Sequence, residues 1–383
     1  MNASPTEPKP LEVAFGLLPV GLLLIVIFTI FQFIRGDLTH ETVQVFYATD
    51  RNHLQPANRP LGIGPLSATA SIEQYGRDRT DNGSLSLGVS NVSIPKDHRM
   101  GELERPSIWH LEFRENPEKH IVLLSAQQKS YQDFYHQLSD SVGQTGQRRV
   151  LVFVPGFAVT FEDALRRTAQ ISYDLNYDGV PVAFSWQSKG EIDPLDYAAD
   201  EATAEWSAPH LAFFLEDLVS KSGAKSVDLV AHSMGNRVLS RALQQIALTN
   251  GASAKFNEVI LAAPDIDRGV FLQLTDAMHA VSRRITVYTS ENDKALRASM
   301  RLHSYPRAGE HADLIVNAGV DPVDASLVAT DFIDHSYFGD NSSVISDMYY
   351  LLELGTPAGQ RFGIRKVPTP KGFYYRFVPH AGG

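Results

Sequence analysis

Six short apolar runs, which recur between residues 120 and 290, constrain the fold of this chain more than any other feature. They read HIVLLSA (120–126), RVLVFVPGF (149–157), VPVAFSW (180–186), SVDLVAHS (226–233), NEVILAAP (257–264) and RITVYTS (284–290). Each run is nearly continuous rather than alternating, a pattern typical of strands that are buried on both faces. The runs therefore predict a sheet with a covering layer on each side.

Helical patterns separate most of these runs. Thr160-Phe161-Glu162-Asp163 resembles a capping box and opens a stretch with apolar residues at helical spacing. Residues 195–220 and 236–248 follow a helical pattern as well. Alternating strands and helices predict an α/β fold with a mostly parallel central sheet, in which reactive groups gather at the carboxyl ends of the strands.

The chain upstream of residue 120 has a different pattern. VQVFYATDR (43–51) predicts a strand, whereas 52–107 is rich in Gly, Pro, Asn and Asp and predicts loops and short strands. We therefore divide the 383 residues into a polar tail (1–12), an anchor (13–34), an extension of strands and loops (35–119), a core (120–355) and a C-terminal tail (356–383).

The run from Val13 to Ile34 contains no charged residue and is bounded by Glu12 and Arg35. As a helix rising about 1.5 Å per residue, it would cross the roughly 30 Å hydrocarbon core of a bilayer. It lacks the polar stripe of a helix that packs on a soluble core, and no small-residue cleavage site follows it. We expect an uncleaved transmembrane helix. The flanking charges are few, and we take a non-cytoplasmic main domain as the working hypothesis.

Charge and composition exclude several classes of function. The formal net charge of -10 argues against nucleic-acid binding, because phosphate contacts need clustered Lys and Arg. The chain has no cysteine, so disulfides, thiolate metal sites and cysteine nucleophiles are excluded. No HExxH, Walker or G-x-G-x-x-G sequence is present, and we therefore predict neither a metal nor a cofactor.

A candidate nucleophile stands in Ala231-His232-Ser233-Met234-Gly235, where an apolar run gives way to a helical pattern. A sharp strand-to-helix turn can expose a reactive serine, and it needs small residues at the crowded positions that Ala231 and Gly235 occupy. The Met234 amide would then lie at a helix N-terminus, where it can stabilise an oxyanion. The alternative interpretation is an ordinary tight turn between a strand and a helix.

A second oxyanion donor should come from the loop after an earlier strand. Val154-Pro155-Gly156-Phe157-Ala158 is that loop. Gly156 allows the backbone to approach closely, and the amides of Phe157 or Ala158 can point at the site. The alternative interpretation is that Gly156 only makes the turn, and for each single residue of the loop it explains the sequence equally well.

Six segments of the chain resemble, in order, those of a bacterial α/β-hydrolase family of unknown physiological role that is broadly esterase- or lipase-like. They are VFYATDR (45–51), IPKDHRMGELERP (94–106), FVPGFA (153–158), FSWQS (184–188), AHSMGN (231–236) and HSYF (335–338). Two residues depart from the family pattern, since Pro155 replaces a His and Gln187 replaces a Pro. The resemblance implies an α/β-hydrolase fold and a Ser–acid–His triad in that chain order.

His335 fits the histidine of such a triad by its late position and by the HSYF match. Its near-neutral pKa suits the removal of the Ser233 proton and its return to the leaving group. His303 and His311 are the other late candidates.

The triad acid should follow a strand between the serine and the histidine. Asp293 follows the run RITVYTS and occupies the position that is commoner in the superfamily, so we choose it. Its role would be to hold the imidazole tautomer and to stabilise the imidazolium. Asp265, after the run NEVILAAP, is the alternative acid, and Asp267 lies in the same loop.

The leading functional hypothesis is a membrane-anchored serine hydrolase that cleaves a small acyl-ester or lipid-like substrate through an acyl-Ser233 intermediate. A different class stays open, namely a non-catalytic α/β-hydrolase-fold module for binding or scaffolding, and Pro155 in the oxyanion loop favours it. Thioesterase, amidase and acyltransferase reactions can use the same triad, because a fold does not settle a function.

Overall fold

The structure is a computed structural model that describes residues 39–54, 75–80, 83–106, 114–189, 194–250, 255–316, 318–328 and 342–378. The predicted anchor (13–34) and His335 both lie outside these ranges. Within them, no helix combines the length and the apolar character that crossing a bilayer requires.

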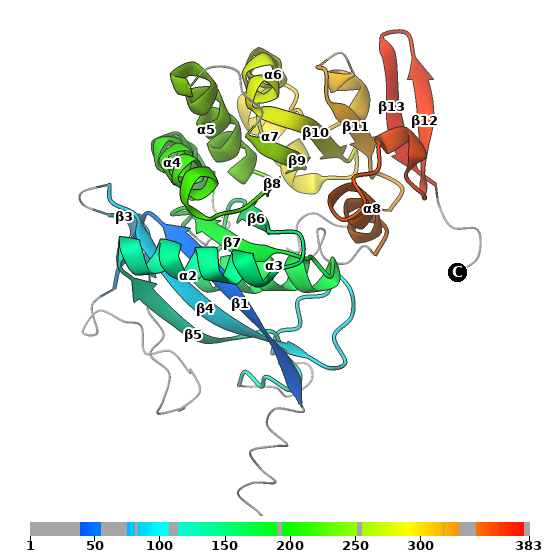
Figure 1. The fold of residues 1–383 in the computed structure, drawn as a ribbon. Coiled ribbons are helices and arrows are strands. Elements are labelled where there is room, and N and C mark those ends of the chain that lie inside the picture. The colour runs from blue at the N-terminus through cyan, green and yellow to red at the C-terminus, as the bar shows by residue number, and fades with distance from the viewer. Residues whose placement is uncertain are drawn as a thin grey trace, which may run out of the picture.

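A single large sheet dominates the fold (Figure 1). In the described residues it has 11 strands, in the order β12-β13-β11-β10-β9-β8-β6-β7-β1-β4-β5. The bounds of these strands are β1 His40–Thr49, β4 Ser86–Pro95, β5 Val122–Lys129, β6 Arg149–Val154, β7 Val180–Ser185, β8 Ser226–His232, β9 Phe256–Ala262, β10 Ser282–Thr289, β11 Asp321–Asp324, β12 Ile364–Thr369 and β13 Gly372–Phe377. A small second sheet pairs β2 (Arg51–His53) with β3 (Tyr75–Arg79).

The strands from β1 and β7 through β6, β8, β9 and β10 to β11 pair in parallel, as the apolar runs predict. The pairs β1–β4, β4–β5 and β12–β13 are antiparallel. The α/β-hydrolase arrangement of a mostly parallel sheet is therefore confirmed. One run behaves differently, because 120–126 gives β5, an antiparallel strand at the edge of the sheet in which Gln127 and Gln128 are exposed.

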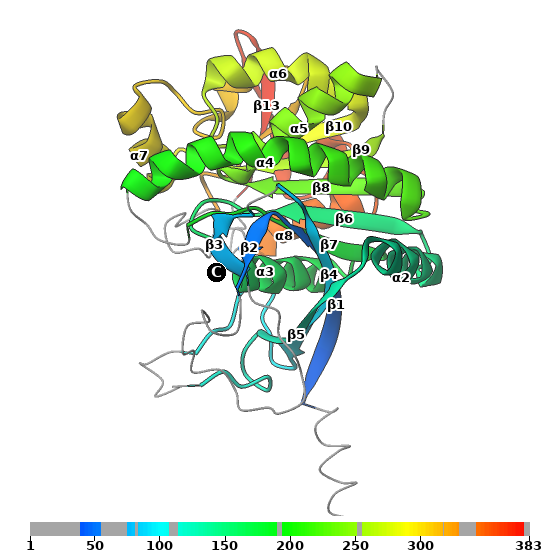
Figure 2. The ribbon, with the colours of Figure 1, turned by 90° about the vertical axis from the view of Figure 1, so that its left-hand side faces the viewer.

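Buried side chains on both faces explain why the central runs are apolar without alternation. In β6, Val150, Val152 and Val154 pack into one core cluster, whereas Leu151 and Phe153 pack into another on the opposite face. The first cluster includes residues of α2 (Tyr131–Gln144), α4 (Pro194–Lys221), α5 (Gly235–Asn250) and α6 (Arg268–Val281). The second includes residues of α3 (Phe161–Asp174) and α8 (Ser342–Leu352), and Figure 2 shows α4 running along the first face.

The capping prediction for α3 is confirmed. The side chain of Thr160 accepts a hydrogen bond from the backbone N–H of Asp163 over 3.2 Å. This contact satisfies one of the free N–H groups at the helix start, and substituting such a cap typically costs about 1 kcal/mol. It also fixes the point at which the loop after β6 enters the helix.

Two boundaries that the sequence suggests do not separate structural units. β4 lies within the stretch 52–107, where we expect loops and short strands, yet it pairs with β1 along its whole length. The C-terminal tail (356–383) contains the hairpin β12–β13, and β13 extends the sheet by pairing with β11. The tail assignment does not describe these residues, because their sheet partners lie far away in the sequence.

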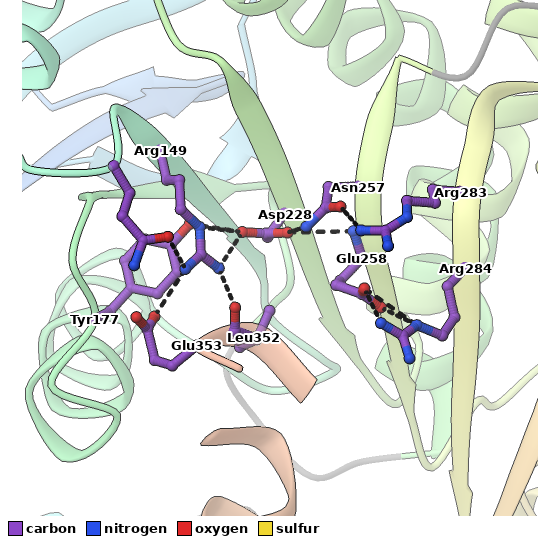
Figure 3. A network of polar contacts seen from close by, with 10 residues as sticks. Arg149, Tyr177, Asp228, Asn257, Glu258, Arg283, Arg284, Leu352 and Glu353 are labelled. Atoms are coloured by element: carbon purple, nitrogen blue, oxygen red, sulfur yellow. Dashed lines mark hydrogen bonds and ion pairs between the residues drawn. The ribbon is translucent and has the colours of Figure 1, made fainter. Parts of the chain in front are cut away.

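A buried polar network joins the amino ends of several parallel strands (Figure 3). Arg149 Nη2 donates to a carboxylate oxygen of Asp228 over 2.8 Å and to the carbonyl of Leu352 over 2.6 Å. The Tyr177 hydroxyl donates to the same Asp228 oxygen over 2.8 Å, and Glu353 pairs with Arg149 at 3.1 Å. Figure 3 follows the network through Asn257, Glu258, Arg283 and Arg284. This cluster ties β6 to β8 and α8 at the edge of the sheet opposite to Ser233.

Candidate active site

Ser233 occupies the turn between β8, which ends at His232, and α5, which begins at Gly235. Its φ angle is 50°, in the left-handed region that a residue with a Cβ atom seldom adopts. Such a conformation costs on the order of 1–3 kcal/mol and persists only where the surroundings enforce it. The turn at the carboxyl end of this central parallel strand therefore has the strained form that the sequence predicts for a turn exposing a reactive serine. We call this turn, residues 231–235, the elbow.

Hydrogen bonds hold the strained turn in place. The Ser233 amide donates to the carbonyl of Ala262 over 2.9 Å, which links the turn to the end of β9. The side-chain amide of Asn236 donates to the carbonyls of Ser233 and Ala262 over 2.9 and 3.0 Å. The last residue of the AHSMGN segment thus fastens the elbow to the neighbouring strand.

The loop after β6 packs directly on this elbow. A Cβ atom built on Gly235 would lie 2.2 Å from the carbonyl oxygen of Pro155. A Cβ atom built on Gly156 would lie 2.9 Å from the Cβ atom of Ser233. Real Cβ atoms do not come so close to other heavy atoms, so both positions require glycine. The two segments that the sequence suggests for one site are therefore in contact.

The same loop has an unusual backbone and one side chain that packs outward. Ala158 has a φ angle of 58°, so it too lies in the left-handed region. The ring of Phe157 meets the ring of Tyr197 edge-on, with centroids 5.3 Å apart. The carbonyl of Pro155 accepts a hydrogen bond from the buried Nε1 of Trp186 over 2.7 Å. Because that acceptor is a backbone group, the departure from His to Pro at position 155 does not remove it.

Asp293 is buried after β10, at the start of α7 (Lys294–His303). Its side chain is the helix N-cap and accepts a hydrogen bond from the Leu296 amide over 2.9 Å. Burial raises the pKa of Asp293 to about 7, and the nearby charge of Asp265 contributes in the same direction, against the lowering effect of the helix amides. A carboxylate in this setting is stabilised by a cation such as an imidazolium.

Asp265 is buried as well, and both of its carboxylate oxygens have partners. Ser299 donates a hydrogen bond to Oδ1 over 2.7 Å, and the Nε atom of Arg307 lies 3.3 Å from the same oxygen. The hydroxyl of Tyr197 donates to Oδ2. The backbone amide of Asp265 donates to the carbonyl of Ser233 over 3.3 Å, so this loop also borders the elbow. Asp267, in the same loop, caps α6 through the amide of Val270.

The two late histidines in the described part of the chain have other partners. His303 lies 2.8 Å from the Ser299 carbonyl through Nδ1 and 2.8 Å from a carboxylate oxygen of Glu201 through Nε2. His311 contacts the carboxylates of Glu291 and Asp313. Both rings are thus engaged away from Ser233. The remaining candidate, His335, belongs to residues 329–341, which follow β11 and are not described.

A cavity of ≈ 320 Å³ is lined by residues of α4, α5 and α6 and by His303, Tyr305 and Arg307. Its lining includes the Glu201–Arg237 ion pair, together with Arg307, Ile266 and Tyr305. Neither Ser233 nor the loop 155–158 lines it. We therefore do not assign this cavity to an acyl chain bound at the serine.

Two buried residues of the resembling segments have contacts that the sequence pattern does not predict. Arg51 closes VFYATDR and Trp186 stands in FSWQS, and both contact the loop after β6. Both residues belong to segments that resemble the family pattern, which marks them as candidates. Their local sequence does not reveal that they contact a loop more than thirty positions away.

Comparison with solved structures finds distant likenesses. A cold-adapted esterase from an Arctic intertidal metagenomic library is 9% identical with a TM-score of 0.34, and the match covers 70% of this chain and 91% of that one. Phospholipase PlaB from Legionella pneumophila is 12% identical with a TM-score of 0.31, covering 60% and 67%. Thermogutta terrifontis esterase 2 is 11% identical with a TM-score of 0.30, covering 79% and 98%. At these values none of them bears on substrate or mechanism. No curated protein matches the chain.

The comparison with protein families is decisive for the class of protein. One family matches residues 130–352, which is more than half of the chain and includes the elbow, the loop after β6 and both candidate acids. The matched segment begins with α2 and ends with α8, so it also spans the parallel strands from β6 to β11. The chain belongs to the family described as alpha/beta hydrolase of unknown function (DUF900).

Proposed function

We propose that this protein is a membrane-anchored serine hydrolase that cleaves carboxylic esters through an acyl-serine intermediate. The observation that carries the proposal is the pairing of Ser233, strained at φ 50°, with a glycine loop that packs against its Cβ atom. A merely structural turn has no need of a strained, non-glycine residue at its tip. Other members of the α/β-hydrolase superfamily place a nucleophile at this position.

The chemistry follows from this arrangement. The Ser233 oxygen attacks the ester carbonyl while His335 takes its proton, and the same proton then passes to the departing alkoxide. Water attacks the acyl-serine in a second, equivalent step and releases the acid. The backbone amides of Met234, Phe157 and Ala158 would stabilise the oxyanion that forms in each step.

We assign the triad acid to Asp293 rather than to Asp265. The carboxylate of Asp265 already accepts hydrogen bonds from Tyr197 and Ser299 and faces Arg307, so its charge is compensated without an imidazole. Asp293 is buried and its pKa is raised to about 7, because desolvation outweighs the stabilisation of its negative charge by the helix amides and Arg297. A neighbouring imidazolium would add to that stabilisation.

The apolar run Val13–Ile34 supports the anchoring part of the proposal. An enzyme tethered at a bilayer would meet acyl esters and other lipid-like substrates at high local concentration. We propose that the catalytic domain lies on the non-cytoplasmic side. Carbonate washing of membranes should leave the full chain bound, and protease accessibility in sealed vesicles should report its side. Release of a chain that begins after residue 34 would contradict the anchor.

A fluorophosphonate probe tests the catalytic proposal, since it labels only activated serines. The full-length chain should be labelled at Ser233, and Ser233→Ala should abolish both labelling and ester turnover. Ser220→Ala, at the far end of α4, is the matched control and should keep both. A folded wild-type chain without labelling or turnover would support the non-catalytic binding module instead. A panel of matched esters, thioesters and amides identifies the preferred acyl compound.

A further inference from the structure

Arg51 is a buried cation that no carboxylate contacts directly among the hydrogen bonds of the described residues. Its side chain is 1% exposed. Nε donates to the Ser185 hydroxyl over 3.0 Å, and Nη1 donates to the carbonyls of Gly76 and Ser188, each over 3.1 Å. Nη2 donates to the carbonyl of Val159 over 2.7 Å. One guanidinium therefore joins three segments: β3, the end of β7 and the loop before α3.

Burying the charged guanidinium of Arg51 costs desolvation free energy, so its hydrogen bonds need an explanation. Desolvation lowers the pKa of Arg51 to about 10, although Asp50, Glu162 and Asp200 oppose the change. The group therefore remains charged at neutral pH. A buried charge is weak evidence for stability, and its hydrogen bonds fix the positions of the groups that accept them. One of these groups, the carbonyl of Val159, belongs to the loop that precedes Thr160.

The loop from Pro155 to Val159 is held at both ends by side chains from outside it. Trp186 Nε1 donates to the carbonyl of Pro155, and Arg51 Nη2 donates to the carbonyl of Val159, each over 2.7 Å. Between these two fixed carbonyls lie Gly156, Phe157 and Ala158, which include the proposed oxyanion donors. Both holding side chains are almost wholly buried, and a hydrogen bond in such surroundings is stronger than one in water.

The holding residues are themselves fixed to one another through the end of β7. The Thr49 hydroxyl donates to the carbonyl of Ser185 over 2.6 Å and accepts from the Arg51 amide over 3.2 Å. Arg51 then bonds to the Ser185 hydroxyl, and Trp186 is the next residue along the chain. Both side chains that hold the loop are therefore connected to the end of β7, Arg51 through its hydrogen bond to Ser185 and Trp186 through the chain itself.

We propose that Arg51 is a positioning residue for the oxyanion loop, with Trp186 holding the opposite end of the same loop. The inference rests on the proposed serine hydrolysis, because it assigns the Phe157 and Ala158 amides to the transition state. Donors that are held in place before the reaction stabilise the developing oxyanion without reorganisation. Loss of the Arg51 contact would let these amides drift, and an error of about 1 Å in such a site can cost 10²-fold in rate.

The test compares Arg51→Lys with Arg149→Lys in the full-length chain. Both substitutions replace a buried arginine that binds several acceptors, but Arg149 lies at the amino ends of the strands, away from Ser233. A lysine keeps the charge and cannot reproduce the planar fork of donors. We expect Arg51→Lys to lower kcat by about 10–100-fold with little change in KM, and to slow fluorophosphonate labelling by a similar factor. Arg149→Lys should lower the melting temperature while its kcat, measured well below that temperature, stays within about twofold.

Trp186→Phe provides a second, independent variant. It removes the Nε1 donor to Pro155 and keeps an aromatic ring, so kcat should fall in the same direction as for Arg51→Lys. If Arg51→Lys is folded and keeps the kcat and labelling rate of the wild type, or loses no more than Arg149→Lys, the positioning role is wrong. If the wild-type chain itself is neither labelled nor active, the proposed function fails and this inference fails with it. The wild-type measurement thus separates the two failures.

Discussion

Gly235 lies against the carbonyl oxygen of Pro155, so closely that a Cβ atom at this glycine would be 2.2 Å from that oxygen. The carbonyl of Val154 would be only 2.7 Å away. The start of α5 and the end of β6 therefore interlock through their backbones, with no room for a side chain between them. This contact brings the loop 155–158 against the turn that carries Ser233.

Gly235→Ala should destabilise the protein, because the new methyl group clashes with the backbone oxygens of Pro155 and Val154. These oxygens belong to consecutive residues, so relieving the clash requires the backbone to shift. Overpacking of this kind costs typically about 1–3 kcal/mol of the free energy of unfolding. Urea denaturation followed by circular dichroism measures the change. Gly143→Ala in α2 is the control: it has nothing within 4 Å of the new Cβ atom and should stabilise by about 0.5–1 kcal/mol. Equal stabilities for the two variants would contradict the interlock.

Ser233→Gly and Ser233→Ala should both abolish turnover but should differ in stability. The φ angle of 50° is unfavourable for any residue with a Cβ atom, and glycine adopts it freely. The glycine variant should therefore have a free energy of unfolding about 1 kcal/mol above that of the alanine variant. Parallel thermal and urea denaturation of the two variants checks this. A glycine variant no more stable than the alanine variant would mean that the turn is not strained in solution.

Asp293→Asn should lower kcat sharply with the fold retained, because the amide favours the wrong imidazole tautomer. The comparable change in a serine protease costs about 10⁴-fold. Asp265→Asn should instead act on stability, since it disturbs a buried pair with Arg307, and breaking such a pair costs about 3–5 kcal/mol. Steady-state kinetics and urea denaturation of both variants separate the two roles. The reverse ranking in kcat would transfer the triad role to Asp265.

The raised pKa of Asp293 predicts a pH-dependent stability. In the folded protein this pKa is about 7, above the ordinary value of 3.8, so between these values the folded state holds a proton that the unfolded state has lost. The free energy of unfolding should therefore fall as the pH rises from about 4 to 7, by an amount on the order of 4 kcal/mol for this group, since one pKa unit corresponds to about 1.36 kcal/mol. Above pH 7 the contribution should level off.

Asp293→Asn isolates this contribution, because asparagine caps a helix about as well as aspartate does but cannot titrate. The variant should gain stability relative to the wild type as the pH rises from 5 to 8 in a series of urea titrations. A difference between the two proteins that stays constant over this range would show that Asp293 titrates at an ordinary pKa in the folded state, as it would with a compensating imidazolium beside it.

The sequence alone determines the features that depend on neighbouring residues. The apolar runs predict the parallel strands from β6 to β10, because a strand buried on both faces needs apolar residues at every position. Thr160 predicts the start of α3, and the small residues around Ser233 predict the sharp turn after β8. Each of these signals is contained in a few consecutive positions, and so each can be identified before the chain is folded.

Tertiary structure decides what depends on residues far apart in the chain. The partner of Arg51 in the oxyanion loop stands 108 positions later, and the serine that pairs with Asp265 stands 34 positions later. Likewise, β4 and the hairpin β12–β13 became part of the sheet through hydrogen bonds to distant strands, although their own compositions suggest loops and a tail. A local pattern records the burial of a residue but not its partner. The hydrogen-bond partners of the two candidate acids, and those of Arg51, therefore became visible only in the folded chain.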